Sequence, residues 1–282
     1  MKSQVVAVAL LLNVGCATER IQVFNTDAMP KSLAPEQWVF EADSVVVSYS
    51  FYASQGVMAF SVYNTSSRPL YIDWKRSSFI HNGAKYDYWV DELVSESNST
   101  IAMQSVGLQT FDWGWTRPMR ITSTLGNASV ATTSFSKRAE RVAFIPPRSY
   151  LDQAKFKLHP NDQFMFNADQ LALDAEPRSN RPSATTVVTT QTFGPDTSPV
   201  RFRNYLAVAR DEEVTDPKFI DHEFWVSSIK EMELRHFRGK LSGYDANGER
   251  IYPRPFKTNK SLYIKLRVNA PVSETGPSSP LP

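Results

Sequence analysis

Cys16 is the residue with the clearest chemical potential, and it is the only cysteine among the 282 residues. It follows one early cation, Lys2, an apolar run over residues 5–12 and a small residue, Gly15. A short apolar segment behind a positive charge is typical of an export signal and is too short to span a bilayer. The pattern predicts cleavage before Cys16 and attachment of diacylglycerol to its sulfur. The alternatives are an ordinary secretory signal with an incidental cysteine, and an amino-terminal core helix.

Histidines are the next candidates for chemistry, and none of the four (His81, His159, His222 and His236) lies in a metal-binding HExxH motif. His222 is flanked by Asp221 and Glu223. Neighbouring side chains of a strand point to opposite faces, so His222 cannot share a site with both carboxylates. Asp221 and Glu223 can share one face, where folding would have to bring in His236 to complete a metal site. The better interpretation is that these are polar residues on the protein surface, and the sequence predicts no metal site.

Motifs of common enzymes are also missing from the sequence. Gly-x-Ser-x-Gly does not occur, and with 11 glycines the chain has no glycine-rich phosphate loop. A pair of carboxylates that hydrolyses glycosides depends on tertiary structure, and nothing local favours any pair. The sequence predicts a non-enzymatic protein without a cofactor, with an envelope hydrolase of unrecognised site as the alternative.

Aromatic and cationic residues between positions 111 and 120 form the best candidate for ligand binding. Trp113 and Trp115 flank a glycine, and Arg117 and Arg120 follow them. Indole rings in a loop can stack on sugars or fill a pocket of a partner, while guanidinium groups donate hydrogen bonds beside them. Aromatic residues two apart on a strand point the same way, so the spacing favours packing in the core over binding.

The charge balance excludes one class of partner. The chain has 31 basic and 29 acidic residues, a net charge of +2, and shows no basic stripe of the kind that binds nucleic acid. No later apolar run approaches the roughly 20 residues of a transmembrane helix. Contact with a membrane is therefore expected through the lipid alone.

Alternating apolar and polar residues in short runs predict strands along most of the chain. Trp74 is expected in the core, Asn82-Gly83 is expected to form a hairpin turn, and residues 231–238 either extend a strand or form a short helix. The pattern predicts an all-β protein: one large antiparallel β-sandwich, immunoglobulin-like, over residues 37–269. The expected strands cover residues 44–52, 57–63, 70–75, 78–81, 84–90, 141–145, 154–158, 186–192, 200–208, 223–229 and 261–268.

The rest of the chain divides into four segments without a regular pattern. Residues 1–15 are expected to be the signal peptide, and residues 16–36, with two prolines, a lipidated tether. Residues 93–138 are rich in serine and threonine and are expected to form a long irregular insertion. Residues 270–282, rich in proline and serine, are expected to be a disordered tail.

Three segments and the amino terminus carry a resemblance to a family. They are residues 71–80 (YIDWKRSSFI), 145–149 (IPPRS) and 201–205 (RFRNY), and together with the start they resemble uncharacterised bacterial lipoproteins. The usual lipobox has leucine where this chain has Asn13. The resemblance implies an exported β-rich domain of unassigned role.

The predicted location is the bacterial cell envelope, at the outer membrane. The sequence does not distinguish a protein that faces the periplasm from one that faces the cell surface. The predicted role is a protein-binding or structural module with an envelope protein as partner. A carbohydrate-binding or adhesion module that uses Trp113 and Trp115 on a glycan is the alternative.

Overall fold

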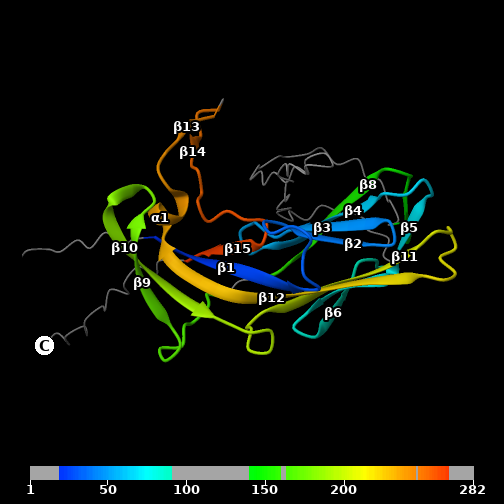
Figure 1. The fold of residues 1–282 in the computed structure, drawn as a ribbon, viewed down its shortest axis with the longest axis horizontal. Helices are drawn as coiled ribbons and strands as arrows, with labels where there is room; N and C mark the ends of the chain where they lie inside the picture. Colours follow the sequence, from blue (N-terminus) through cyan, green and yellow to red (C-terminus); the bar gives the residue numbers. More distant parts are fainter. Residues whose placement is uncertain (1–18, 91–139, 160–162, 246, 267–282) are drawn as a thin grey trace, which may run out of the picture.

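The computed structural model describes residues 19–90, 140–159, 163–245 and 247–266, and these residues are almost entirely β-structure (Figure 1). The all-β prediction is confirmed, while the immunoglobulin-like sandwich order stays a prediction. The elements are β1 (Arg20–Met29), β2 (Trp38–Ala42), β3 (Val45–Ser50), β4 (Val57–Asn64), β5 (Leu70–His81), β6 (Ala84–Asp87), β7 (Val142–Ile145), β8 (Tyr150–Lys157), β9 (Ala172–Arg178), β10 (Arg181–Thr192), β11 (Arg201–Ala209), β12 (Lys218–Glu233), α1 (Leu234–Arg238), β13 (Gly243–Tyr244), β14 (Arg250–Ile251) and β15 (Ser261–Lys265).

The described strands form two main antiparallel sheets and one small hairpin. The nine-stranded sheet runs β15-β1-β12-β11-β5-β6, with β10 on β12, β9 on β10 and β7 on β5. The four-stranded sheet runs β2-β3-β4-β8, and β13 pairs with β14. At 16 residues, β12 is long enough to pair with β1, β10 and β11, so it connects the two ends of the larger sheet.

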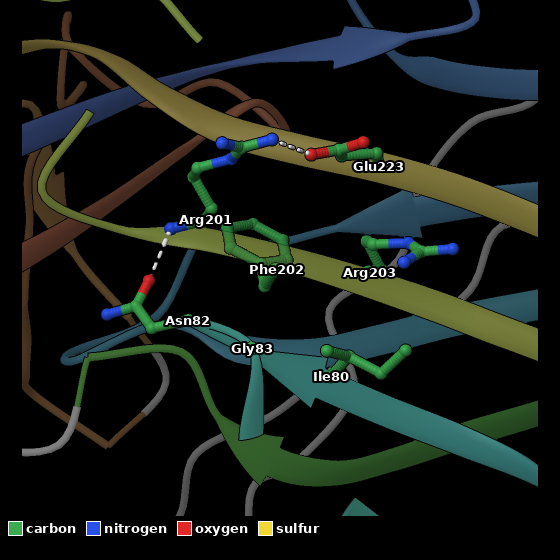
Figure 2. Close-up of a pocket in the computed structure, with 7 residues that line it drawn as sticks. All are labelled: Ile80, Asn82, Gly83, Arg201, Phe202, Arg203 and Glu223. Atoms are coloured by element: carbon green, nitrogen blue, oxygen red, sulfur yellow. Dashed lines mark hydrogen bonds and ion pairs between the residues drawn. The ribbon is translucent and has the colours of Figure 1, made fainter. Parts of the chain in front are cut away.

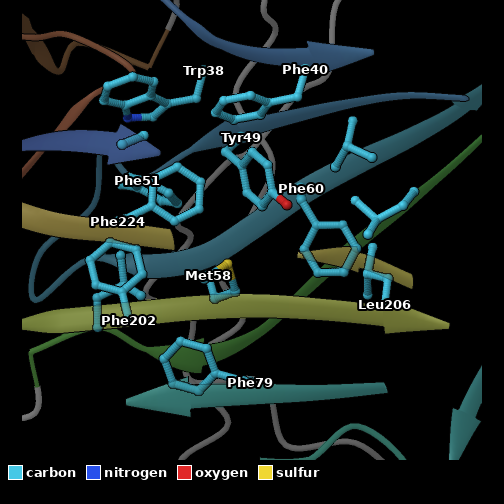
Figure 3. Packing of buried hydrophobic residues seen from close by; sticks show 14 of the residues in the cluster. Trp38, Phe40, Tyr49, Phe51, Met58, Phe60, Phe79, Phe202, Leu206 and Phe224 are labelled. Carbon is cyan, nitrogen blue, oxygen red and sulfur yellow. The ribbon is translucent and has the colours of Figure 1, made fainter. Parts of the chain in front are cut away.

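The core lies between the two main sheets and is rich in aromatic side chains (Figure 3). Phe224 of β12 is fully buried at the centre of this layer. Edge-on and stacked contacts of this kind add to the stabilisation from burial alone. Its ring centroid lies between 4.8 and 6.0 Å from those of Trp38, Phe40, Tyr49, Phe51 and Phe202.

The predicted tether over residues 16–36 is wrong where it overlaps β1. Arg20–Met29 is a strand between β12 and β15, in the interior of the nine-stranded sheet. The sequence of β1 does not show the alternation of apolar and polar residues expected of a strand, because Gln22, although polar, is fully buried. Its amide is satisfied by the backbone of Phe164, at 2.8 and 2.9 Å, and by Glu231 at 2.9 Å. From sequence alone, a polar side chain that is buried with its hydrogen bonds satisfied cannot be told from a polar side chain on the surface.

The local predictions agree with the structure at several points. Asn82 and Gly83 both have positive φ, 46° and 83°, as the two-residue turn between β5 and β6 requires. Trp74 is buried in the core. Both alternatives for residues 231–238 occur, one after the other: β12 continues to Glu233, and α1 follows directly.

Other predictions differ in extent or lie outside the described residues. Two expected strands join into the single β5, and β10 begins at Arg181, five residues before the expected strand. The signal peptide, the whole of the insertion over residues 93–138 and the tail over residues 270–282 fall outside the described part of the chain.

Replacing Phe224 with alanine tests the central position of its ring. The substitution removes a ring buried among five aromatic neighbours, so we expect the free energy of unfolding to fall by about 3–5 kcal/mol in urea titrations. Phe219→Ala, on the same strand but with its side chain 51% exposed, is the matched control and should cost less than about 1 kcal/mol. Equal losses for the two variants would contradict this description of the core.

Candidate functional site

The outer face of β11 and β12 carries an ordered set of charged and aromatic side chains. Period two along β11 buries Phe202 and Leu206 and places Arg201, Arg203 and Tyr205 on the opposite face. The register pairs Arg203 with Glu223 and Tyr205 with Asp221 on β12, so the same face of the next strand is acidic.

Each arginine on this face is paired diagonally with a carboxylate of β12. Arg201 lies 2.6 Å from Glu223, and Arg203 donates to both carboxylate oxygens of Asp221. Hydrogen bonding to these carboxylates raises the pKa of both guanidinium groups above the ordinary arginine value. The two-point contact of Arg203 with Asp221 fixes the plane of that guanidinium group, whereas a single hydrogen bond joins Arg201 to Glu223.

A shallow hollow of about 460 Å³ adjoins these pairs (Figure 2). Asn82 closes one side, because its Oδ1 accepts a 2.8 Å hydrogen bond from the backbone N–H of Arg201. None of the lining residues is a serine, cysteine, histidine or lysine, so the hollow offers no hydroxyl, thiol or amine nucleophile and no histidine base. The lining residues are Ile80, Asn82, Gly83, Arg201, Phe202, Arg203 and Glu223.

Apolar groups extend the same face beyond the hollow. Tyr205 and Phe219 stack with their ring centroids 5.0 Å apart, and Phe219 is half exposed. Met29, opposite Glu223 on β1, is 62% exposed. Arginine, tyrosine, phenylalanine and methionine are the residue types enriched in protein interfaces. This outer face, from Met29 to Tyr205, therefore has the composition of a protein-binding surface.

On the inner face of the same strands, four polar side chains form a buried chain of hydrogen bonds. Tyr88 donates to Asn204 at 2.8 Å, Asn204 donates to the hydroxyl of Tyr49 at 3.1 Å, and that hydroxyl lies 2.8 Å from Nδ1 of His222. Burial lowers the pKa of His222 to about 4, so the ring is neutral and Nδ1 accepts from Tyr49. These hydrogen bonds link the two sheets, because Tyr49 is on β3 while Asn204 and His222 are on the larger sheet.

The prediction that His222 faces away from Asp221 and Glu223 agrees with the structure, but the interpretation of His222 as a surface residue is wrong, because it is buried. His222 points into the core and stacks on Phe40 at 4.1 Å, while Asp221 and Glu223 pair with arginines outside. His236 is not brought to the two carboxylates, since it follows β12 in α1. Within the part of the chain that the structure describes, no cluster of three or more His, Cys, Asp or Glu side chains can hold a metal ion.

His236 has a serine and a carboxylate beside it, but not in the arrangement of a catalytic triad. Nδ1 accepts the backbone N–H of Ser179 at 3.0 Å, and Nε2 lies 3.3 Å from Glu176. The hydroxyl of Ser179 donates to the backbone carbonyl of His236 instead of to the ring. A nucleophilic serine must hydrogen-bond to the ring of its base. This cluster therefore fastens the β9–β10 turn onto α1.

The residues that the sequence singled out for function lie outside the described ranges. Cys16 precedes them, and Trp113, Trp115, Arg117 and Arg120 fall between residues 90 and 140. Lipidation and glycan binding therefore stay predictions. Sequence reasoning missed the outer face, although Arg-x-Arg-x-Tyr at 201–205 and Asp-x-Glu at 221–223 both have the period of a strand.

Comparison with known proteins adds no assignment. No protein family, curated protein or solved structure matches the chain. None of the described helices is both long and apolar enough to cross a bilayer.

The low pKa of His222 predicts a dependence of stability on pH. Between pH 6.5 and 4 the unfolded chain binds a proton at this histidine and the folded chain does not, so acid favours unfolding. We expect His222 alone to reduce the free energy of unfolding by about 2 kcal/mol between pH 7.5 and pH 5. Urea titrations of the parent and of His222→Gln at several pH values test this. The contribution of His222 is the difference in how far the free energy of unfolding falls with pH, since the other histidines are common to both. Parallel pH profiles would refute the assignment.

Proposed function

We propose that the chain is a lipid-anchored protein of the bacterial cell envelope whose β-fold acts as a non-enzymatic protein-binding module. The observation that carries the binding role is the outer face of β11 and β12, where paired arginines and exposed aromatic and methionine side chains adjoin a shallow hollow. The face has carboxylates and guanidinium groups in equal number at its centre. It therefore suits a protein partner with both signs of charge better than a uniformly acidic or basic one.

Pre-organisation supports this role. Arg201 and Arg203 are held by Glu223 and Asp221 before any partner arrives, so little side-chain entropy is lost on binding. The rigid sheet beneath them keeps Tyr205 and Phe219 at a fixed spacing. Large side chains in fixed positions are the usual source of binding energy in interfaces.

The sequence supports the anchor. Cys16 follows an apolar run and a small residue, as acceptance of a diacylglycerol requires. Two acyl chains bury enough methylene groups for stable attachment, whereas one chain gives marginal binding.

Metabolic labelling with an alkynyl fatty acid tests the anchor. We expect the parent chain to carry the label and to fractionate with membranes, because the thiol of Cys16 is the proposed attachment point. Cys16→Ser should lose both the label and the membrane retention. A Cys16→Ser protein that keeps full label would defeat the lipid proposal.

Site-specific photocrosslinking in intact bacterial cells tests the binding face. Benzoylphenylalanine placed at Tyr205 or at Phe219 should give an adduct of the same mass, because both positions lie on one face. Arg203→Glu should reduce the yield of that adduct about tenfold, as loss of an interface arginine does.

The same probe at Leu173 is the control, since this side chain is 64% exposed but lies on β9. The proposal is wrong if Leu173 gives the adduct equally well, or if Arg203→Glu leaves the yield unchanged.

A further inference from the structure

A second surface lies at the end of the molecule where β1 begins. The chain between Leu234 and Lys257 forms α1 and then the hairpin of β13 and β14, which stands out from the body of the protein (Figure 1). We name this segment, residues 234–257, the projection.

The projection is closed at its base by a tight backbone contact. Gly239 has a φ of 76°, and a Cβ at this position would lie 2.8 Å from the ring of Pro253. The backbone N–H of Arg254 donates to the carbonyl of Arg238 at 3.1 Å. Only glycine allows this approach, so the two ends of the excursion are held together and the hairpin between them faces outward.

Charge on the projection is strongly positive. Two carboxylates are present, and Asp245 already accepts from the backbone N–H groups of Asn247 and Glu249 in the hairpin turn. Unlike Arg201 and Arg203, the cations take part in none of the ion pairs formed among the described residues. The exposed cations are Arg235, Arg238, Lys240, Arg250, Arg254 and Lys257.

Three of these cations, Arg250, Arg254 and Lys257, line a hollow of about 310 Å³ together with Ile251, Tyr252 and Pro253. Burial, and then the charge of Arg254, lowers the pKa of Lys257 below the ordinary lysine value. The like charges of Arg254 and Lys257 repel one another, and an anion between them would relieve the repulsion. Guanidinium and ammonium groups are the usual partners of phosphate.

Apolar side chains are interspersed with the cations. Leu241, Tyr244 and Ile251 are exposed on the hairpin, and Tyr244 is 61% exposed. Tyrosine beside aliphatic residues and cations is the composition of surfaces that lie at the boundary between lipid headgroups and acyl chains.

The projection is next to the place where the proposed lipid would leave the fold. The carbonyl of Glu19 accepts a 2.8 Å hydrogen bond from the N–H of Leu234, the first residue of α1. Glu19 is three residues from Cys16, a distance of at most about 11 Å in extended chain. A lipid on Cys16 would therefore hold the projection against the bilayer surface.

We propose that the projection docks on an anionic membrane surface, with the phosphate of a lipid headgroup in the hollow lined by Arg250, Arg254 and Lys257. The inference rests on the proposed anchor for its location, but the phosphate site can be tested without the lipid. Leu241, Tyr244 and Ile251 enter the interface beside the headgroups. Docking then fixes the orientation of the β-fold, which a flexible lipid attachment alone would leave open.

Flotation with lipid vesicles tests the site on residues 16–282 carrying Cys16→Ser, which keep every described residue and cannot be acylated. The protein should bind vesicles containing about one-third phosphatidylglycerol and leave pure phosphatidylcholine vesicles unbound. Arg250→Glu with Arg254→Glu should weaken binding by about twenty-fold or more, since each cation near the surface contributes about fivefold. Binding should also fall at about 0.5 M salt, where screening is strong.

Arg68→Glu with Arg148→Glu is the matched control, because both arginines are exposed loop residues outside the projection. This control and Arg250→Lys with Arg254→Lys should bind as the parent does. Equal loss in both glutamate doubles, binding to neutral vesicles, or equal binding of a DNA duplex would overturn the proposal. Failure here leaves the fatty-acid labelling of Cys16 unaffected, so the two proposals fail separately.

Discussion

Phe224 and the aromatic rings around it hold the two sheets together, and the outer face of β11 and β12 depends on that contact. Apolar packing of this kind is strong but has little directionality. The buried chain from Tyr88 through Asn204 and Tyr49 to His222 supplies direction, because its hydrogen bonds are made only in one relative position of the sheets. Sliding one sheet would leave these groups buried without partners, at a cost of about 1–3 kcal/mol each.

The same strand, β12, connects the two surfaces for which roles are proposed. Its early residues Asp221 and Glu223 lie on the outer face, and its last residue, Glu233, precedes α1 and the projection. Twelve residues of strand separate Asp221 from Glu233, roughly 40 Å along the strand. The cations differ accordingly: those of the outer face are paired with carboxylates, whereas those of the projection form no ion pair with a described carboxylate and lie beside tyrosine rings. A protein docked through the projection would hold the outer face away from the bilayer.

Alternation along the chain was sufficient for the all-β class, for the turn at Asn82-Gly83 and for the burial of Trp74, because each depends on neighbours in sequence. It failed at β1, since Gln22 is buried by virtue of partners on β12 and on the loop before β9. The length of β12 was also underestimated, because the residues at both ends of the strand include many polar side chains, as surface loops do. The arginine–carboxylate pairs of the outer face were present as two strand-period patterns but could not be joined without knowing that β11 lies beside β12.

The sequence by itself determined that this chain is built of strands and that its one cysteine follows an apolar run and a small residue, because both are properties of adjacent residues. Only the tertiary structure decided which strands are neighbours, which polar groups are buried with partners, and that the start of β1 lies against α1. Those facts depend on contacts between residues as far apart as Glu19 and Leu234, for which no local pattern exists.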